Sequence, residues 1–377
     1  MGGVSMEWKE VRLGDILNFR RGHDLPHSAM KPGKIPVAGS NGIIGYHDTA
    51  TPMKPILTIG RSGNVGKPYF YEEAWAHNTT LYVDDFKGND PKFLYYLCQT
   101  MPFANFGGGS AVPTLNRNHI HPLETKIPVK VEDQHRIASI LSSLDRKIEL
   151  NNKINADLEE MAQAIFKNWF VDFEPFKDGK FVDSELGMIP EGWKVVVFDN
   201  ILKVTTTKTG KEGIPEYSVT NTGIHPRDEK FTKNLSKSSA KNKLIRKGNL
   251  VFGMSREILN WGIMKEKVGG VSSAYNVYIV DEKIVSTTYL ECFIAQRMDY
   301  FADLIKPASR EGQGVDKALL MKKIIYIPPS EVLDVFLEKY NSIMHLTEIR
   351  NQENSCLSLL RDTLLPRLMS GELEVPE

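Results

Sequence analysis

The sequence is poor in cysteine and has no long apolar stretch. Its three cysteines, Cys98, Cys292 and Cys356, stand far apart in 377 residues, with no C-x-x-C pair and no histidine at metal-ligand spacing. This pattern argues against a disulfide framework and a zinc site, and it favours a reducing, cytoplasmic setting. No hydrophobic run approaches the roughly 20 residues that span a bilayer, and no signal-peptide pattern opens the sequence, so we expect no membrane segment.

Catalytic signatures are also missing. The segment GRSGNVGKP, residues 60–68, resembles a phosphate-binding loop, but Arg61 stands where that loop needs its first glycine. Pro68 stands where the loop needs a serine or threonine. No H-E-x-x-H or G-x-S-x-G motif occurs, no G-x-G-x-x-G follows a strand, and the Pro-Pro pair in YIPPSE lacks the flanking residues that amino-methyltransferases use. The sequence therefore predicts no active site and no cofactor of its own.

A net charge of zero, from 47 basic and 47 acidic residues, conceals an alternation along the chain. Residues 8–130 carry a net charge of +4 and residues 193–330 carry +8. Residues 131–192 carry −6 and residues 331–377 carry −5. A polyanion suits the two basic segments, whereas the acidic segments are expected to face other partners.

The chain also repeats in sequence. Trp8-Lys9 is followed by Ile-Leu eight residues later, and Trp193-Lys194 is followed by Ile-Leu at the same distance. Further on, five residues match five others at a constant offset: Asn155, Leu158, Met161, Ile165 and Phe166 match Asn354, Leu357, Leu360, Leu364 and Leu365. The offset grows from 185 to about 200, which predicts about fifteen extra residues in the second half, some of them within 230–247.

Each basic segment shows alternating apolar and β-branched runs between Gly, Pro and Asn turns. The runs at 54–60, 80–83, 249–253 and 275–280 predict strands, and those at 93–100 and 289–303 predict helices. We therefore expect two similar domains of mixed α/β (α+β) class. Trp8 and Trp193 open matching strands, so both are expected in the cores.

The acidic segments have a helical pattern instead. No Pro or Gly interrupts residues 131–173, and a 4-3 spacing of apolar residues predicts a coiled-coil seam. In the first copy the seam is Ile137, Leu141, Leu144, Ile148, Asn151, Asn155, Leu158, Ala162, Ile165 and Trp169. In the second copy it is Phe336, Tyr340, Ile343, Thr347, Arg350, Asn354, Leu357, Arg361, Leu364 and Leu368. Because Asn155 and Asn354 occupy matching places, the pattern predicts one shared polar layer.

These patterns together predict the organisation of the chain. Residues 1–130 form the first domain, and residues 131–185 form a central long helix and linker. Residues 186–330 form the second domain, and residues 331–377 form a distal long helix. The two helices, each about 57 Å long, are expected to pair antiparallel and to hold the domains apart, with an internal pseudo-twofold repeat.

Side chains suited to DNA are spread through the loops of both basic segments. Arginine reads guanine, asparagine reads adenine, and lysine mostly holds phosphate. In the first domain the candidates are Arg20, Arg21, Asn41, Arg61, Ser62, Asn64, Lys67, Asn78, Asn116, Arg117 and Asn118. In the second domain they are Lys208, Lys211, Lys237, Lys241, Lys243, Arg256, Asn260, Ser272, Ser273, Asn276 and Arg310.

A second set of candidates lies on the first long helix and just after it. Most of these side chains are apolar residues outside the expected seam, which one helical partner cannot cover. They are assigned to binding a partner protein: Ile140, Met161, Phe166, Trp169, Phe170 and Phe173.

Several stretches resemble the specificity subunits of type I restriction–modification systems. They are WKEVRLGDIL, IGRSGNVGKPYF followed by AHNTTLYV, and AVPTLNRNHI leading to KIPV. The most specific is IFKNWFVDFEPFKDG with SELGMIPEGWKVV, and the chain closes on LLRDTLLPRLMSGEL in a similar way. The second domain departs from the glycine-loop pattern, with MSREILNWG where the first has GRSGNVG.

The resemblance implies two target-recognition domains, each reading half of a split DNA site. It implies helices that act as spacer and as docking surface for two modification subunits, which methylate adenine with S-adenosylmethionine. Restriction subunits would add translocation and cleavage that use ATP and magnesium. Two other functions remain open from sequence: a coiled-coil interaction scaffold, and a DNA-modifying enzyme whose motifs are not recognisable.

Overall fold

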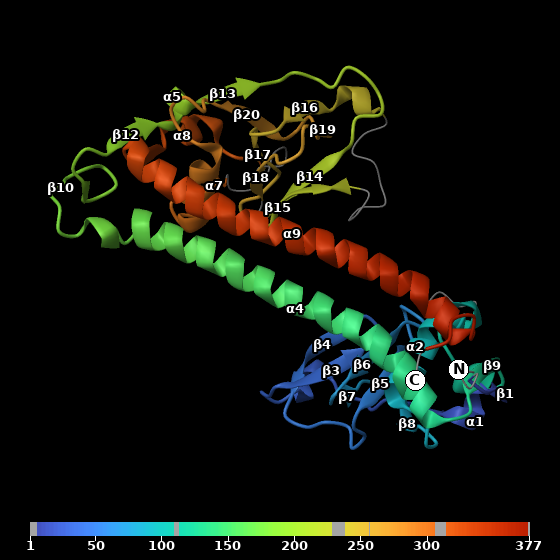
Figure 1. Cartoon of the computed structure of the whole chain (residues 1–377). Coiled ribbons are helices and arrows are strands. Elements are labelled where there is room, and N and C mark those ends of the chain that lie inside the picture. The colour runs from blue at the N-terminus through green and yellow to red at the C-terminus, as the bar shows by residue number, and fades with distance from the viewer. Residues whose placement is uncertain (1–5, 109–112, 228–237, 256, 306–313, 376–377) are drawn as a thin grey trace. The chain divides into compact units, whose positions relative to one another are not determined.

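The fold is given by a computed structural model, which describes residues 6–108, 113–227, 238–255, 257–305 and 314–375. The chain divides into two compact units, residues 1–154 with 349–377 and residues 155–348. The two longest helices are α4 (Val131–Phe170) and α9 (Ser330–Met369), of 40 residues each. Both helices cross the division, so each contributes one part to each unit (Figure 1).

The first unit is built on an antiparallel sheet in the order β2-β8-β5-β6. Its strands are β2 (Asn18–Arg21), β5 (Ile56–Gly60), β6 (Pro68–Tyr71) and β8 (Thr80–Asp85). A second sheet holds the hairpin of β3 (Ile35–Gly39) and β4 (Gly42–His47), with β7 (Trp75–Ala76) parallel to β3. A ribbon of β1 (Trp8–Arg12) and β9 (Glu124–Pro128) leads into α4.

Helices of the first unit cover this sheet and complete its core. They are α1 (Leu13–Ile16), α2 (Pro91–Thr100) and α3 (Arg117–Ile120), with the short turns η1 (His27–Ala29) and η2 (Phe103–Phe106). Asp90 caps α2, because its carboxylate accepts from the backbone N–H of Phe93 at 2.7 Å. The buried face of α2 packs against side chains from β5 and β8, and Trp8 packs partly buried against the same core.

The second unit repeats this order of elements. The four-stranded sheet is β13-β20-β17-β18, formed by β13 (Leu202–Thr205), β17 (Leu250–Phe252), β18 (Trp261–Ile263) and β20 (Asn276–Val280). The other pairs are β10 (Phe181–Val182) with β11 (Ile189–Pro190), β12 (Lys194–Val197) with β21 (Ile324–Ile327), β14 (Tyr217–Thr220) with β15 (Gly223–Pro226), and β16 (Lys243–Arg246) with β19 (Val268–Val271). The helices are α5 (Phe198–Ile201), α7 (Thr287–Gln296) and α8 (Lys317–Lys322), with the turns η3 (Glu174–Phe176), η4 (Ser239–Lys241) and η5 (Ala302–Leu304).

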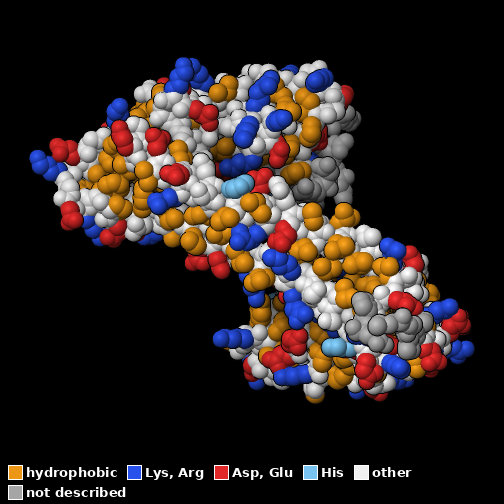
Figure 2. All heavy atoms as spheres, viewed as in Figure 1, with side chains coloured by type: hydrophobic (Ala, Val, Ile, Leu, Met, Phe, Trp, Pro, Cys, Tyr) orange, Lys and Arg blue, Asp and Glu red, His pale blue; other side chains and the backbone are white. Residues whose placement is uncertain are grey.

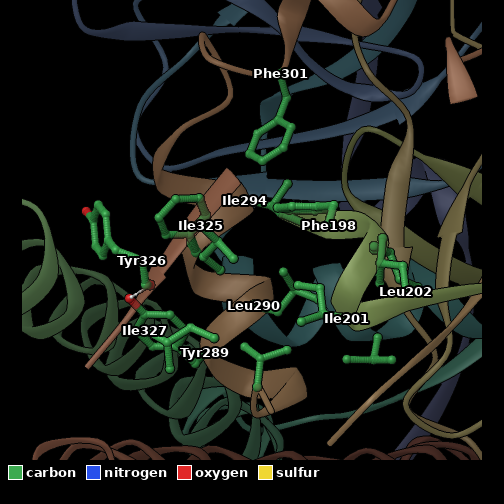
Figure 3. Packing of buried hydrophobic residues seen from close by; sticks show 14 of the residues in the cluster. Phe198, Ile201, Leu202, Tyr289, Leu290, Ile294, Phe301, Ile325, Tyr326 and Ile327 are labelled. Atoms are coloured by element: carbon green, nitrogen blue, oxygen red, sulfur yellow. Dashed lines mark hydrogen bonds between the residues drawn. The ribbon is translucent and has the colours of Figure 1, made fainter. Parts of the chain in front are cut away.

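The core of the second unit is rich in aromatic rings. Figure 3 shows side chains of α5, α7 and β21 pointing into one interior, among them Phe198, Leu290 and Ile325. Tyr289 is fully buried there and its hydroxyl donates to the carbonyl of Tyr326 at 2.9 Å. Trp193 is buried in the same core, as predicted.

The predicted strands are all present, and the mixed α/β class with an internal repeat is confirmed. The expected helix at 289–303 is shorter, because α7 ends at Gln296 and a separate turn, η5, follows. The helix ends where Arg297 turns its guanidinium to the hydroxyl of Tyr326, at 2.8 Å.

Some of the extra residues of the second unit lie between β15 and β17, the connection that contains the predicted stretch 230–247. Residues 48–55 join β4 to β5, whereas residues 227–249 join β15 to β17, so the second connection is fifteen residues longer. Its described part forms η4 and β16, and β16 pairs with β19. The first unit has no described strand in the place of β16.

In the first unit, α4 and α9 pair antiparallel around a polar layer. The Nδ2 of Asn151 donates to the Oδ1 of Asn354 at 2.9 Å and to Glu353 at 2.7 Å, and Asn354 donates to Asn152 at 2.9 Å. Asn151 is fully buried. The partner of Asn354 in this layer is Asn151, one helical turn before the predicted Asn155, because in an antiparallel pair a residue meets its own repeat copy only at the twofold axis.

In the second unit, the buried stripe of α4 departs from the expected seam. Phe166 and Phe170 are fully buried, whereas Ile165 and Trp169 are only partly buried. The ring of Phe170 lies 4.9 Å from that of Phe336 on α9 and 5.1 Å from that of Tyr289 on α7. The stripe shifts because the domain core, as well as α9, covers this end of the helix.

Among the described residues, no helix has the length and apolar character needed to cross a membrane.

Candidate nucleic-acid interface

The β5–β6 connection, residues 61–67, is a loop in which four backbone N–H groups bond within the protein. The N–H groups of Arg61 and Ser62 donate to the carbonyl of Thr79, and those of Gly63 and Gly66 donate to Pro113 and Gly60. A phosphate-binding loop needs such N–H groups to point at the ligand. These four N–H groups are therefore not directed at a ligand.

Five predicted DNA-binding residues of the first unit come together around one hollow of about 390 Å³. They are Arg20 and Arg21 on β2, Arg61 after β5, Asn116, which caps α3, and Arg117, the first residue of α3. Thr114, Leu81 and Leu115 complete the lining. These residues lie in three separate segments of the sequence, and the fold gathers them.

The other candidates of the first unit surround this hollow without lining it. Asn41 is exposed on the β3–β4 turn, and Asn64 and Lys67 are exposed on the β5–β6 connection. Ser62 is partly buried, Asn118 is exposed on α3, and the partly buried Asn78 donates through its Nδ2 to the carboxylate of Asp24.

In the second unit the predicted lysines gather around β16. Lys208, Lys211 and Lys241 are exposed, and Lys208 forms a backbone bridge to Lys243. The Nζ of Lys243 donates to the carbonyl of Tyr275 at 2.6 Å, and burial lowers the pKa of this lysine. Figure 2 shows blue Lys and Arg side chains gathered over the region where Figure 1 labels β16 and β20.

The β17–β18 connection of the second unit is folded differently from its counterpart. The Nδ2 of Asn260 donates to the carbonyl of Met254 at 2.6 Å, and its backbone N–H donates to Ser255 at 2.9 Å. The side chain of Ile258 is 57% exposed at the tip. Among the remaining candidates, Asn276 is buried, Ser272 is partly buried and Ser273 is exposed. Lys237, Arg256 and Arg310 lie outside the described residues.

Sequence reasoning missed Lys317, the first residue of α8. It is exposed and stands in the second unit where Arg117 stands in the first, directly after the capping residue. It lies near Lys243, whose pKa its charge also lowers. The offset of 200 between Asn116-Arg117 and Asp316-Lys317 would have identified it.

The partner candidates on the first long helix fall into two groups. Phe166, Phe170 and Phe173 are buried in the core of the second unit. Their assignment to a partner-binding surface required exposed side chains, so the structure does not support it. Ile140 and Trp169 are partly buried, and Met161 is 53% exposed.

The long helices carry further exposed apolar side chains, and their positions repeat. Leu150 on α4 is 52% exposed, and its repeat counterpart Ile349 on α9 is 47% exposed. Met161 is 53% exposed, and its counterpart Leu360 is 47% exposed. Orange hydrophobic side chains are visible along α9 in Figure 2.

No group of three or more His, Cys, Asp or Glu side chains in the described part of the chain is placed to hold a metal ion.

Comparison with known proteins gives one family. Residues 6–160 match the family model described as type I restriction modification DNA specificity domain. The MjaIX specificity subunit of Methanocaldococcus jannaschii, a type I restriction enzyme, is 30% identical over 310 residues, which are 76% of this chain and 70% of that one. The HindI specificity subunit of Haemophilus influenzae is 24% identical over 446 residues, covering 96% of this chain and 94% of that one.

The fold has a solved counterpart as well. The crystal structure of a type I restriction–modification S subunit from M. genitalium matches with a TM-score of 0.53 and 14% sequence identity, covering 97% of this chain and 96% of that one. The identity to the M. jannaschii subunit extends over more than two thirds of both chains. The chain therefore belongs to the specificity subunits of type I restriction enzymes, the non-catalytic DNA-recognition components of these systems.

Proposed function

We propose that the chain reads a DNA target in two separate halves, one with each domain, and directs adenine methylation and restriction by partner subunits in the cytoplasm. Residues 1–130 and 186–330 are the two target-recognition domains. Residues 131–185 and 331–377 supply the spacer and the docking surface. S-adenosylmethionine, ATP and magnesium belong to the partners, which are two modification subunits and the restriction subunits.

One observation carries the proposal: the same arrangement of strands occurs twice, with different side chains at matching positions. Arg20 and Arg21 lie opposite Tyr82 and Leu81 on β8. The matching positions of the second unit, 185 residues further along the chain, are Thr205, opposite Val277 on β20, and Thr206. Two domains of one architecture with different side chains at matching positions suit two different half-sites.

The repeated exposed apolar residues support two copies of one partner. Met161 and Leu360 are repeat counterparts, so a partner that covers one has a matching place at the other. Exposed apolar side chains recurring on two helices are typical of a protein interaction surface. Two modification subunits, bound at these two places, fit this pattern.

The function is tested by producing the chain together with its modification subunits and sequencing the methylated adenines of the host genome. We expect one motif with two short specified parts separated by an unread spacer. Exchange of the second domain for that of a related subunit should change one part only. Methylation at a continuous motif, or by the chain alone, would contradict the proposal.

Met161→Glu and Leu360→Glu should each remove one modification subunit from the complex. A carboxylate in an apolar contact costs binding energy, and we expect affinity for that subunit to fall about tenfold or more. The stoichiometry, measured by native mass spectrometry, should change from two modification subunits to one. The stability of the isolated chain should stay unchanged, because both side chains are exposed.

Two variants serve as controls for this experiment. Gln163→Glu puts the same charge on an exposed polar position of α4 and should leave both modification subunits bound. Phe170→Ala should instead destabilise the isolated chain by about 3–5 kcal/mol, since it empties a buried ring site. If Met161→Glu keeps full stoichiometry and affinity, the apolar positions do not mark the docking surface.

A further inference from the structure

The hollow of the first unit is unusual for its concentration of positive charge. Arg20, Arg21, Arg61 and Arg117 all line its roughly 390 Å³, and no carboxylate of the described residues does. The side chains of Arg20 and Arg21 are 61% and 53% exposed, so they remain open to a ligand. A concave site with four guanidinium groups attracts an anion.

Two of these arginines are oriented by the backbone. The Nη1 of Arg117 donates to the carbonyl of Phe19 at 3.2 Å, and the Nη1 of Arg61 reaches the carbonyl of Asn78 at 3.5 Å. A guanidinium has five N–H donors, so each keeps most of them for a ligand. Fixing one donor to the protein lowers the entropy lost when the remaining donors bind.

The other two arginines each lie near one carboxylate. Arg21 pairs with Asp24 at 2.9 Å, and Asp24 also accepts from Asn78. Arg20 lies 3.9 Å from Asp84. With two carboxylates beside four guanidinium groups, the hollow keeps an excess of two positive charges.

The shape of the site favours one of the two kinds of group that DNA offers a protein, the base edges and the phosphates. Base edges are recessed in the grooves, so reading them requires a side chain or an element that projects. Phosphate groups project from the backbone and accept paired hydrogen bonds from arginine. A hollow lined by several guanidinium groups therefore fits a phosphate better than a base.

The second unit carries other side chains at the positions that match these arginines. The positions of Arg20 and Arg21 are taken by Thr205 and Thr206, and among the matching positions described Lys317 repeats a positive charge, at the place of Arg117. The lysines of that unit lie around β16, which has no described counterpart in the first unit. The two domains thus differ in how they hold the backbone.

We propose that the arginine hollow seats a single DNA phosphate of the first half-site and fixes the register of the first domain on the duplex. The second domain holds its half-site through several separate contacts between lysines and phosphates, so its binding does not depend on any single phosphate. This inference rests on the proposed function, because it needs the first domain to contact a half-site.

The test uses the complex with modification subunits and duplexes carrying the methylated motif's sequence. In each duplex one phosphate is replaced by an uncharged methylphosphonate, and all positions of both half-sites are scanned. We expect binding to fall about tenfold or more at one position in the first half-site, as the loss of charged hydrogen bonds predicts. Every position in the second half-site should change binding by less than about threefold.

The arginines are then linked to that position. Arg20→Ala and Arg61→Ala should each weaken binding of unmodified DNA about tenfold and should no longer respond to the methylphosphonate. The matched control is Lys34→Ala, an exposed basic residue of the first unit that is neither in the hollow nor among the DNA-binding candidates, and it should keep the response at full size. Thermal unfolding of Arg20→Ala, whose side chain is 61% exposed, should match the unaltered chain.

Three outcomes overturn the inference while leaving the proposed function intact. One is a bipartite motif that is bound with no sensitive phosphate in the first half-site. Another is a sensitive phosphate whose effect persists in both arginine variants. The third is a relaxed base requirement in these variants with an unchanged phosphate profile, which would make the arginines base readers. Absence of any bipartite motif defeats the proposed function itself.

Discussion

A chain with one heptad inserted into each long helix should methylate both original half-sites with an unread spacer about three base pairs longer. Seven helical residues add about 10.5 Å, and DNA rises about 3.4 Å per base pair. The insertions belong after Ile154 in α4 and after Glu348 in α9, where the chain divides between its units. At these places they leave the contacts within each unit in position.

Sequencing of methylated adenines in cells with this variant measures the spacer directly. The matched control inserts three residues at each place, which turns each helix by about 300° and breaks the phase of the seam. That control should lose methylation. A variant with the heptads that methylates the original motif at full level would show that the helices do not set the distance.

The long helices and the repeat were predictable because their signals are local and periodic. The 4-3 spacing is visible within one helix, and the greater length of the second domain follows from the change in offset alone. The register of the antiparallel helix pair could not be predicted in this way. Which residue faces Asn354 depends on how two segments 200 residues apart meet, and Asn151 takes that place where sequence matching pointed to Asn155.

The phenylalanines of the first helix show a second limit of sequence reasoning. An apolar residue outside a coiled-coil seam is compatible with a partner protein or with the chain's own domain. Phe166 and Phe170 pack on α7 and on Phe336, and no pattern within the helix distinguishes that outcome from an exposed patch.

The arginine hollow was predictable in its residue types and not in its geometry. Arg20, Arg61 and Arg117 follow from their residue type and their place in loops. Their convergence depends on the pairing of β5 with β8 and of β8 with β2, which are non-local contacts. Lys317, by contrast, was available from the repeat.

A fragment that ends near residue 180 should form a twofold dimer and, with modification subunits, should methylate a palindrome built from the first half-site. The reason is that the first long helix can take the place of the second. Leu365, Leu368 and Met369 of α9 pack on the core of the first unit. Their repeat counterparts are Phe166, Trp169 and Phe170, equally apolar, so a second copy can supply them.

The polar layer should survive in such a dimer, and one ion pair should not. Asn354 corresponds to Asn155, so Asn151 of each copy would meet Asn155 of the other. Arg361 pairs with Asp145 at 2.9 Å, and its counterpart Ala162 has no charge. Ala162→Arg in the fragment should therefore restore the pair and tighten the dimer, by up to about fivefold.

Charge opposes this dimer, because residues 131–180 carry a net charge of −3 in each copy, from ten acidic and seven basic side chains. Repulsion between exposed charges is screened by salt, so the dimer should tighten as ionic strength rises. Light scattering of the fragment at low and moderate salt measures the proportions of monomer and dimer. In the fragment, Phe170→Ala should weaken the dimer, because Phe170 of one copy would pack on the other. In the whole chain the same substitution empties a site in the core of the second unit. A fragment that stays monomeric at tens of micromolar, with and without Ala162→Arg, would mean that the two helices are not interchangeable.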